Sequence, residues 1–111
     1  MASDRWDVVR VLFPFAERTA AKHRPGLVVS APEFAVTHGR YIIVMITTAK
    51  AGRRPDDITV TDRSMGGLPE DCVIRVAAIA AVSDHLIDGR RGTITAKDRR
   101  AVTGLLRRYL P

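Results

Sequence analysis

The sequence predicts a single α+β domain over residues 1–111, mainly β, built as a small barrel with a C-terminal α-helix. Three observations lead to this class. Short runs rich in Val, Ile and aromatic residues are separated by Pro and Gly, the chain ends in an apolar stripe of helical spacing, and the length suits one hydrophobic core. Several strands followed by a helix, without regular alternation, are typical of an α+β fold.

The strands are predicted from apolar runs and from the residues that end them. Residues 6–13 form a first strand that stops at Pro14, and residues 26–31 form a second that stops at Pro32. The pair His38-Gly39 is a turn signal before the next strand. The remaining predicted strands cover residues 41–48, 58–61 and 72–76, with a glycine-containing turn at 63–67 between the last two.

Helical structure is predicted after the strands. Residues 83–89 read as one or two helical turns between an N-cap serine and a glycine. A longer helix follows Thr95, whose spacing to Asp98 resembles a capping box. Its apolar stripe at i, i+3, i+4 and i+7 consists of Val102, Leu105, Leu106 and Tyr109.

The composition points to an anionic partner. The formal charge is +6, and 15 of the 18 basic residues are Arg, which binds phosphate with two parallel donors. Nucleic acid, or an acidic protein that competes with it, is therefore the expected partner, although a solvated arginine-rich surface is the alternative. The longest apolar run, residues 41–46, is too short to span a membrane, and no secretory signal is visible, so a cytoplasmic protein without membrane contact is expected.

Cys72 is the only cysteine. It excludes an intrachain disulfide and a multi-thiolate metal site, and we expect it to be a small buried residue within a strand.

A candidate anion site is carried by two strands. Arg24 stands before Pro25, which lacks an N–H and is expected to mark the beginning of its strand. A second strand ends in Thr47 and Thr48 and delivers two hydroxyl groups. A fixed guanidinium, the neighbouring His23 and a threonine together suit phosphate oxygens. The alternative is a surface arginine beside an ordinary strand, with Thr47 present for its β propensity.

Further residues are candidates for contact with a nucleic acid. Residues 49–57 have the composition of a mobile basic loop, with Gly52 and Pro55 among the charges. A polar loop is predicted at residues 15–22. The side chains assigned to RNA contact are Lys22, His23, Thr48, Lys50, Arg53, Arg54 and Glu17.

The order of these pieces resembles the PemK/MazF family of toxin ribonucleases. The matching pieces, in chain order, are Phe13-Pro14-Phe15, His23-Arg24-Pro25 with Leu27, Val28 and Ser30, then Ile46-Thr47-Thr48, and Gly67-Leu68-Pro69-Glu70-Asp71-Cys72-Val73. The terminal segment, residues 89–109, is similar to the family's closing helix. The resemblance covers the chain from about Trp6 to Tyr109.

The resemblance implies a fold, an activity and partners. It implies an SH3-like barrel of the PemK and CcdB type, a homodimer, and cleavage of single-stranded RNA without a metal or another cofactor. By position, Arg24 matches the family's catalytic arginine and Thr47 its catalytic threonine. A cognate acidic antitoxin is the implied protein partner, and contact with DNA is expected only through that antitoxin.

Two segments depart from the family pattern. The first loop has Glu17-Arg18-Thr19-Ala20 where many members have Gly-Ser-Glu-Gln, and residues 78–81 are Ala-Ile-Ala-Ala where many have Gln-Ile-Arg-Thr. These departures motivate one alternative, a catalytically weak or inactive module that binds RNA or antitoxin. A second alternative is a gyrase-binding toxin of the CcdB type, which depends on a tryptophan-bearing C-terminal tail, whereas the only tryptophan here is Trp6.

Overall fold

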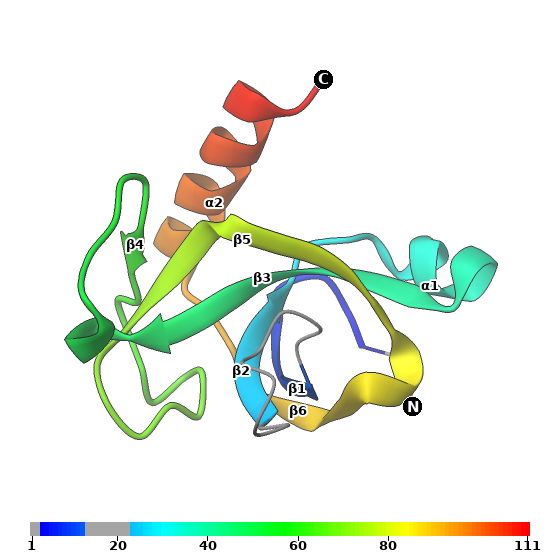
Figure 1. The fold of residues 1–111 in the computed structure, drawn as a ribbon, viewed down its shortest axis with the longest axis horizontal. Helices are drawn as coiled ribbons and strands as arrows, with labels where there is room; N and C mark the ends of the chain where they lie inside the picture. Colours follow the sequence, from blue (N-terminus) through cyan, green and yellow to red (C-terminus); the bar gives the residue numbers. More distant parts are fainter. Residues whose placement is uncertain (1–2, 13–22) are drawn as a thin grey trace.

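The computed structural model describes residues 3–12 and 23–111 (Figure 1). The predicted loop at 15–22, with Glu17 and Lys22, lies outside the described residues, as does the end of the first predicted strand at Phe13. The elements are β1 (Asp7–Leu12), β2 (His23–Val28), α1 (Pro32–His38), β3 (Arg40–Thr48), β4 (Ile58–Thr59), β5 (Cys72–Ser83), β6 (Ile87–Thr93) and α2 (Ala96–Tyr109), with 3-10 turns at Ala49–Ala51 and Asp84–Leu86.

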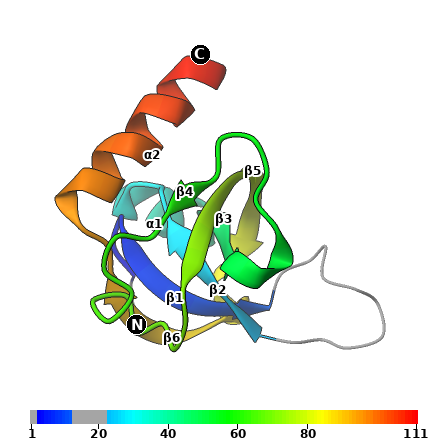
Figure 2. The same ribbon diagram turned by 90° about the vertical axis from the view of Figure 1, so that its left-hand side faces the viewer.

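The six strands form one antiparallel sheet in the order β4-β5-β3-β2-β1-β6. The sheet curls strongly, and β3 and β5 cross over the layer that contains β1, β2 and β6 (Figures 1 and 2). The β-dominated α+β class with a C-terminal helix is thus confirmed. The predicted barrel is not closed, because β4 and β6 at the two ends of the sheet order do not pair with each other.

Successive residues of the central strands divide between two hydrophobic clusters. Val8 and Val44 belong to one cluster, whereas their neighbours Val9 and Ile43 belong to the other. Because side chains alternate across a strand, the curled sheet buries both of its faces. Val102 of α2 is fully buried in the first cluster, so the helix covers that face beside β4 and β5 (Figure 2). No helix in the described part of the chain is long and apolar enough to cross a membrane.

The terminal helix follows its sequence signals. The side chain of Thr95 accepts a hydrogen bond from the backbone N–H of Asp98 at 3.2 Å, as an N-cap should. The Asp98 side chain does not make the reciprocal capping-box hydrogen bond to the backbone N–H of Thr95. Its buried carboxylate instead accepts the backbone N–H and the hydroxyl of Thr61, at 2.8 and 2.6 Å, and so fastens the first turn of α2 to the segment after β4.

Three local predictions were wrong. Pro25 does not begin its strand, which starts at His23. Pro32 occupies the first turn of α1, where its missing N–H is not needed, rather than simply ending a strand. The helix predicted at 83–89 is only a 3-10 turn, and Gly89 lies within β6, where its φ of +93° suits an irregular strand.

Candidate functional site

The site forms where two neighbouring strands stop pairing. The ladder between β2 and β3 runs from Val28 opposite Ile43 to Gly26 opposite Met45 and goes no further. The next residue of β2 is Pro25, which has no N–H to give to β3, and beyond Gly26 the strand is paired only with β1. Extending the antiparallel register by two residues would place Arg24 directly opposite Thr47. The two predicted catalytic residues therefore lie just beyond the last β2–β3 pair, Arg24 on β2 and Thr47 on β3.

A pocket of about 270 Å³ occupies this opening. Its β2 wall is made by Arg24 and Pro25, and its β3 wall by Ile46, Thr47 and Thr48. The pocket thus brings together three residues that the sequence analysis assigned to the site. The full lining consists of Arg24, Pro25, Ile46, Thr47, Thr48, Ala51, Leu68, Pro69, Glu70, Cys72 and Arg91.

The opposite side of the pocket is made by the segment before β5 and by β6. This segment packs against β6 with almost no space between the two backbones: a Cβ at Gly92 would collide with the carbonyl of Met65. Gly67 has a φ of +66°, and a Cβ there would lie 2.5 Å from the carbonyl oxygen of Arg91. The backbone N–H of Thr93 donates to the Met65 carbonyl at 3.0 Å. These glycines allow the contact that gives the pocket its second side.

The charges around the pocket are predominantly positive. Arg24 and Arg91 both line it, and its carboxylate, Glu70, lies 3.7 Å from the ammonium group of Lys50. Lys50 therefore stands at the rim, where it offsets the negative charge of Glu70. A phosphate group entering the pocket would meet two guanidinium groups and two threonine hydroxyls, which is a suitable donor set for its oxygens.

The thiol of Cys72 is a buried group at the edge of this site. Cys72 is buried as predicted, and burial, with Glu70 and Asp71 nearby, raises the pKa of its thiol above the usual value. A protonated thiol attacks poorly. Its hydrogen bond runs to the backbone carbonyl of Glu70 at 3.3 Å, which indicates a role in holding the pocket's edge.

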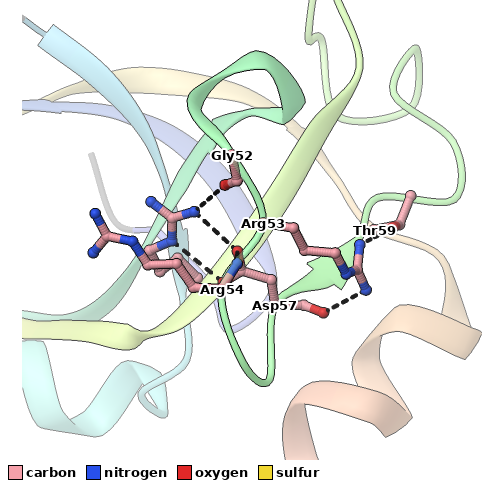
Figure 3. A network of polar contacts seen from close by, with 6 residues as sticks. Gly52, Arg53, Arg54, Asp57 and Thr59 are labelled. Atoms are coloured by element: carbon pink, nitrogen blue, oxygen red, sulfur yellow. Dashed lines mark hydrogen bonds and ion pairs between the residues drawn. The ribbon is translucent and has the colours of Figure 1, made fainter.

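Residues 49–57, predicted as a mobile basic loop, carry several internal hydrogen bonds. The guanidinium of Arg53 donates to the Thr59 hydroxyl at 2.8 Å and to the Asp57 carbonyl at 2.9 Å (Figure 3). The backbone N–H of Arg54 donates to the Asp57 carboxylate at 2.8 Å. Arg53 does not line the pocket of Arg24 and Thr47.

A buried ion pair fixes the same segment to β5. Arg75 donates to the carboxylate of Asp57 at 2.9 Å and to the carbonyl of Gly52 at 2.7 Å, and the two charged side chains are only 7% and 1% exposed. Burial alone would raise the pKa of Asp57, but the bonds from Arg75 and from the Arg54 N–H lower it below the usual value. The carboxylate is held ionised.

Arg54 faces a different part of the molecule. It lines a larger, mainly apolar groove of about 570 Å³, formed with Leu105, Leu106 and Tyr109 of α2 and with Ile79 of β5. His23, at the start of β2, is exposed. The structure therefore gathers Arg24, Thr47 and Thr48 at one pocket, with Lys50 next to it through Glu70, and places Arg53 and Arg54 outside it.

Sequence reasoning missed Arg91 and Glu70 as pocket residues. Glu70 was quoted only as part of a motif, and Arg91 fell in a segment for which no strand was predicted. The run Ile87-Asp88-Gly89-Arg90-Arg91-Gly92-Thr93 lacks the β-branched alternation of an ordinary strand, so the pattern gave little signal for β6. The glycine at 92, tight against Met65, is the one clue to a close backbone contact there.

Comparison with known families decides the classification. A family model described as "PemK-like, MazF-like toxin of type II toxin-antitoxin system" matches residues 4–110. The chain belongs to this family. The PemK/MazF resemblance read from the sequence is therefore confirmed over nearly its whole length. No curated protein matches the sequence at a significant level.

Solved structures share the fold of this PemK/MazF chain. MazF (Form-I) from Deinococcus radiodurans superposes with a TM-score of 0.75 at 20% identity, covering 96% of this chain and 94% of that one. An endoribonuclease in complex with its cognate antitoxin from a mycobacterial species gives 0.75 at 19% identity, covering 99% and 98%. Toxin MazF-mt6 of Mycobacterium tuberculosis gives 0.67 at 17%, covering 88% and 89%. At these identities the likeness establishes the fold.

Proposed function

We propose that this toxin is an endoribonuclease that cleaves single-stranded RNA, including messenger RNA, and thereby inhibits translation and growth. The observation that supports the proposal is the position of Arg24 and Thr47, which line one pocket from opposite sides of the open β2–β3 ladder. Family membership supports the same reaction class.

The proposed reaction uses the RNA's own 2′-hydroxyl as the nucleophile. The 2′-oxygen forms a bond to the adjacent phosphorus while the bond to the 5′-oxygen breaks, which leaves a 2′,3′-cyclic phosphate and a free 5′-hydroxyl. The proton lost by the 2′-hydroxyl is balanced by the proton gained at the 5′-oxygen. The protein has to align the attack and to stabilise negative charge on the phosphorane oxygens. No cofactor is required for these steps.

Arg24 is assigned the electrostatic part of this work. Its guanidinium can donate two parallel hydrogen bonds to phosphorane oxygens. Thr47 is assigned the positioning of the 2′-hydroxyl or of a phosphate oxygen, since a threonine hydroxyl is not a strong base. Because DNA lacks the 2′-hydroxyl, it would bind without being cut.

The other predicted RNA contacts are proposed to follow the RNA backbone away from the pocket. Thr48 lines the pocket, Lys50 is paired with the pocket residue Glu70, and His23 is the neighbour of Arg24 in β2. Arg53 and Arg54 would contact phosphates further along the strand. Lys22 and Glu17 are proposed to contact the RNA as well.

The proposed partners are a second copy of the chain and an acidic antitoxin. A homodimer would extend the groove beyond what one small protomer offers. A positively charged site that attracts RNA also attracts an acidic, partly disordered segment, which would fold across it and block access. We propose a cytoplasmic location, with DNA contacted only through the antitoxin.

The test is incubation of the purified protein with mixed-sequence RNA in the presence of EDTA, with a DNA of the same sequence as the control. Cleaved RNA ending in 2′,3′-cyclic phosphate, with DNA intact, is the expected result. Binding of RNA without cleavage would favour the inactive binding module. Inhibition of gyrase with RNA left intact would favour the CcdB-type alternative. Full cleavage by a strictly monomeric species would contradict the shared groove.

A further inference from the structure

We propose that Arg91 is a second phosphate-binding residue of this site, and that it holds the phosphate next to the scissile one and so positions the RNA. The inference rests on the proposed ribonuclease function and adds a residue that the sequence did not indicate. Arg91 lines the same pocket as Arg24 and Thr47 but comes from β6, on the other side of β1.

A β-bulge presents Arg91 to the pocket. In the pairing of β1 with β6, Val8 lies opposite Gly92 and the next residue, Val9, lies opposite Arg90. Arg91 is therefore the extra residue that has no partner on β1. Bulges of this kind redirect a side chain and are frequent next to active sites.

The bulge gives two consecutive arginines different tasks. Arg90 donates to the carboxylate of Asp7 at 2.9 Å, so its charge is balanced within the protein. Arg91 donates to a carbonyl, that of Gly67, at 3.2 Å, and no carboxylate among the described residues lies within ion-pair distance of it. A guanidinium at a pocket whose partner among the described residues is a carbonyl, with no carboxylate in ion-pair distance, is available to an anionic ligand.

The hydrogen bond to the Gly67 carbonyl also orders the Arg91 side chain before any ligand binds. One Nη of the guanidinium is held by the segment that packs closely on β6, while the group keeps further donors for phosphate oxygens. Ordering the side chain before binding lowers the entropy lost on binding. A surface arginine with no fixed partner lacks this advantage.

The strand order favours two phosphates over one. Arg24 and Arg91 lie on strands separated by β1, and they also differ in level along it: Arg24 lies opposite Val11, whereas Arg91 lies between the partners of Val8 and Val9. Two arginines that reach one pocket from different strands and different levels suit two successive phosphates of a single strand better than one shared phosphate. Arg24, opposite Thr47, would hold the reacting phosphate, and Arg91 its neighbour.

Binding to an RNA that cannot be cleaved tests the proposal separately from catalysis. The probe is a short mixed-sequence RNA in which every 2′-hydroxyl is replaced by fluorine, and affinity is measured by fluorescence anisotropy over a salt series. Arg91→Ala is expected to weaken binding about tenfold, the scale of one lost charge-assisted hydrogen bond. The slope of log affinity against log salt should fall by about 0.7, the value for one phosphate contact on a single strand.

Two further variants separate a phosphate contact from a structural effect. Arg91→Lys keeps the charge and should keep the salt slope, with an intermediate affinity. Arg107→Ala, which removes an exposed arginine from α2 away from the pocket, is the matched control and should leave affinity and slope unchanged. Natural RNA should be cleaved by Arg91→Ala with a raised KM and a largely retained kcat.

The proposal would be overturned if Arg91→Ala and Arg107→Ala had equal affinities and equal slopes of log affinity against log salt. It would also be overturned if Arg91→Lys lowered that slope as much as Arg91→Ala. If the unaltered protein binds the fluorinated RNA but cleaves no natural RNA, the proposed function fails. The slope of Arg91→Ala then still decides whether Arg91 binds phosphate. Failure of the unaltered protein to bind this RNA at all would overturn the Arg91 contact, while cleavage of natural RNA would continue to support the function.

Discussion

Arg24 and Arg75 show two uses of the same side chain in one small sheet. Arg75 is buried on β5 and satisfied by the carboxylate of Asp57 and the carbonyl of Gly52. Arg24 lies on β2 beside a pocket lined by threonine hydroxyls. Burial of a charge is tolerated only with a close partner of opposite charge, whereas a charge at a pocket can be satisfied by a ligand. Arg75 should therefore govern stability, and Arg24 activity.

The largest expected effect is on stability, from removing the partner of Arg75. Asp57→Ala leaves a buried guanidinium without its counter-charge, and breaking such a pair costs about 3–5 kcal/mol. The free energy of unfolding from urea titration measures the loss. Asp88→Ala is the matched control, because Asp88 pairs with Arg10 at a similar distance on the surface, where such pairs contribute about 0–1 kcal/mol. Equal losses for the two variants would contradict the distinction.

The same pair predicts a dependence of stability on pH. Folding lowers the pKa of Asp57. The contribution of its carboxylate to the free energy of unfolding is therefore complete above the pKa of an unfolded Asp, about 3.9, and is lost as the pH falls through the lower pKa of the folded state. The difference in unfolding free energy between the unaltered protein and Asp57→Ala should stay constant from neutral pH down to about 5 and shrink at lower pH. If the difference already shrinks between pH 7 and pH 5, the pH dependence arises from a group other than Asp57.

Next in size is the effect of Arg24 on catalysis. Arg24→Ala should lower the cleavage rate by roughly 10²-fold or more, the scale for one lost charge-stabilising donor, and should leave the thermal midpoint unchanged. Arg24→Lys should restore little, because a point charge cannot replace the planar fork. Single-turnover cleavage and thermal unfolding are measured on the same preparations. Wild-type activity in Arg24→Ala would limit the family likeness to the fold.

A smaller loss is expected at the other side of the ladder opening. Thr47→Val keeps the strand's shape and removes the hydroxyl, so activity should fall by about fivefold, the worth of one neutral hydrogen bond. Folding and RNA affinity should persist. The double variant with Arg24→Ala should lose less than the product of the single losses, because both residues act on one transition state. Multiplicative losses would argue for separate roles.

The smallest effect is expected at Lys50. Its side chain is 87% exposed and lies 3.7 Å from Glu70, so Lys50→Ala should change stability by less than about 1 kcal/mol. RNA affinity should fall modestly, and the salt slope should drop by about 0.7 if Lys50 contacts a phosphate. Unfolding in urea and the salt series measure the two quantities. An unchanged slope would remove Lys50 from the proposed RNA contacts.

The sequence by itself determined the local chemistry. Pro25 has no N–H, so it cannot donate a hydrogen bond to any strand beside it, whatever the fold. The motif around Arg24 and the consecutive hydroxyls of Thr47 and Thr48 could likewise be recognised in the sequence because they are local features. The cap at Thr95 and the buried Val102 followed from helical spacing, which is also local.

Only the tertiary structure decided which distant residues meet. Asp57 and Arg75 are paired across the sheet, and Arg91 reaches the pocket through a bulge that exists only once β6 pairs with β1. The pairing of β2 with β3, which ends at Gly26 and Met45, brought Arg24 and Thr47 to one pocket, and strand pairing depends on contacts far apart in the chain. Local preference cannot specify such pairings, because their energy comes from packing and hydrogen bonds that form together when the sheet assembles.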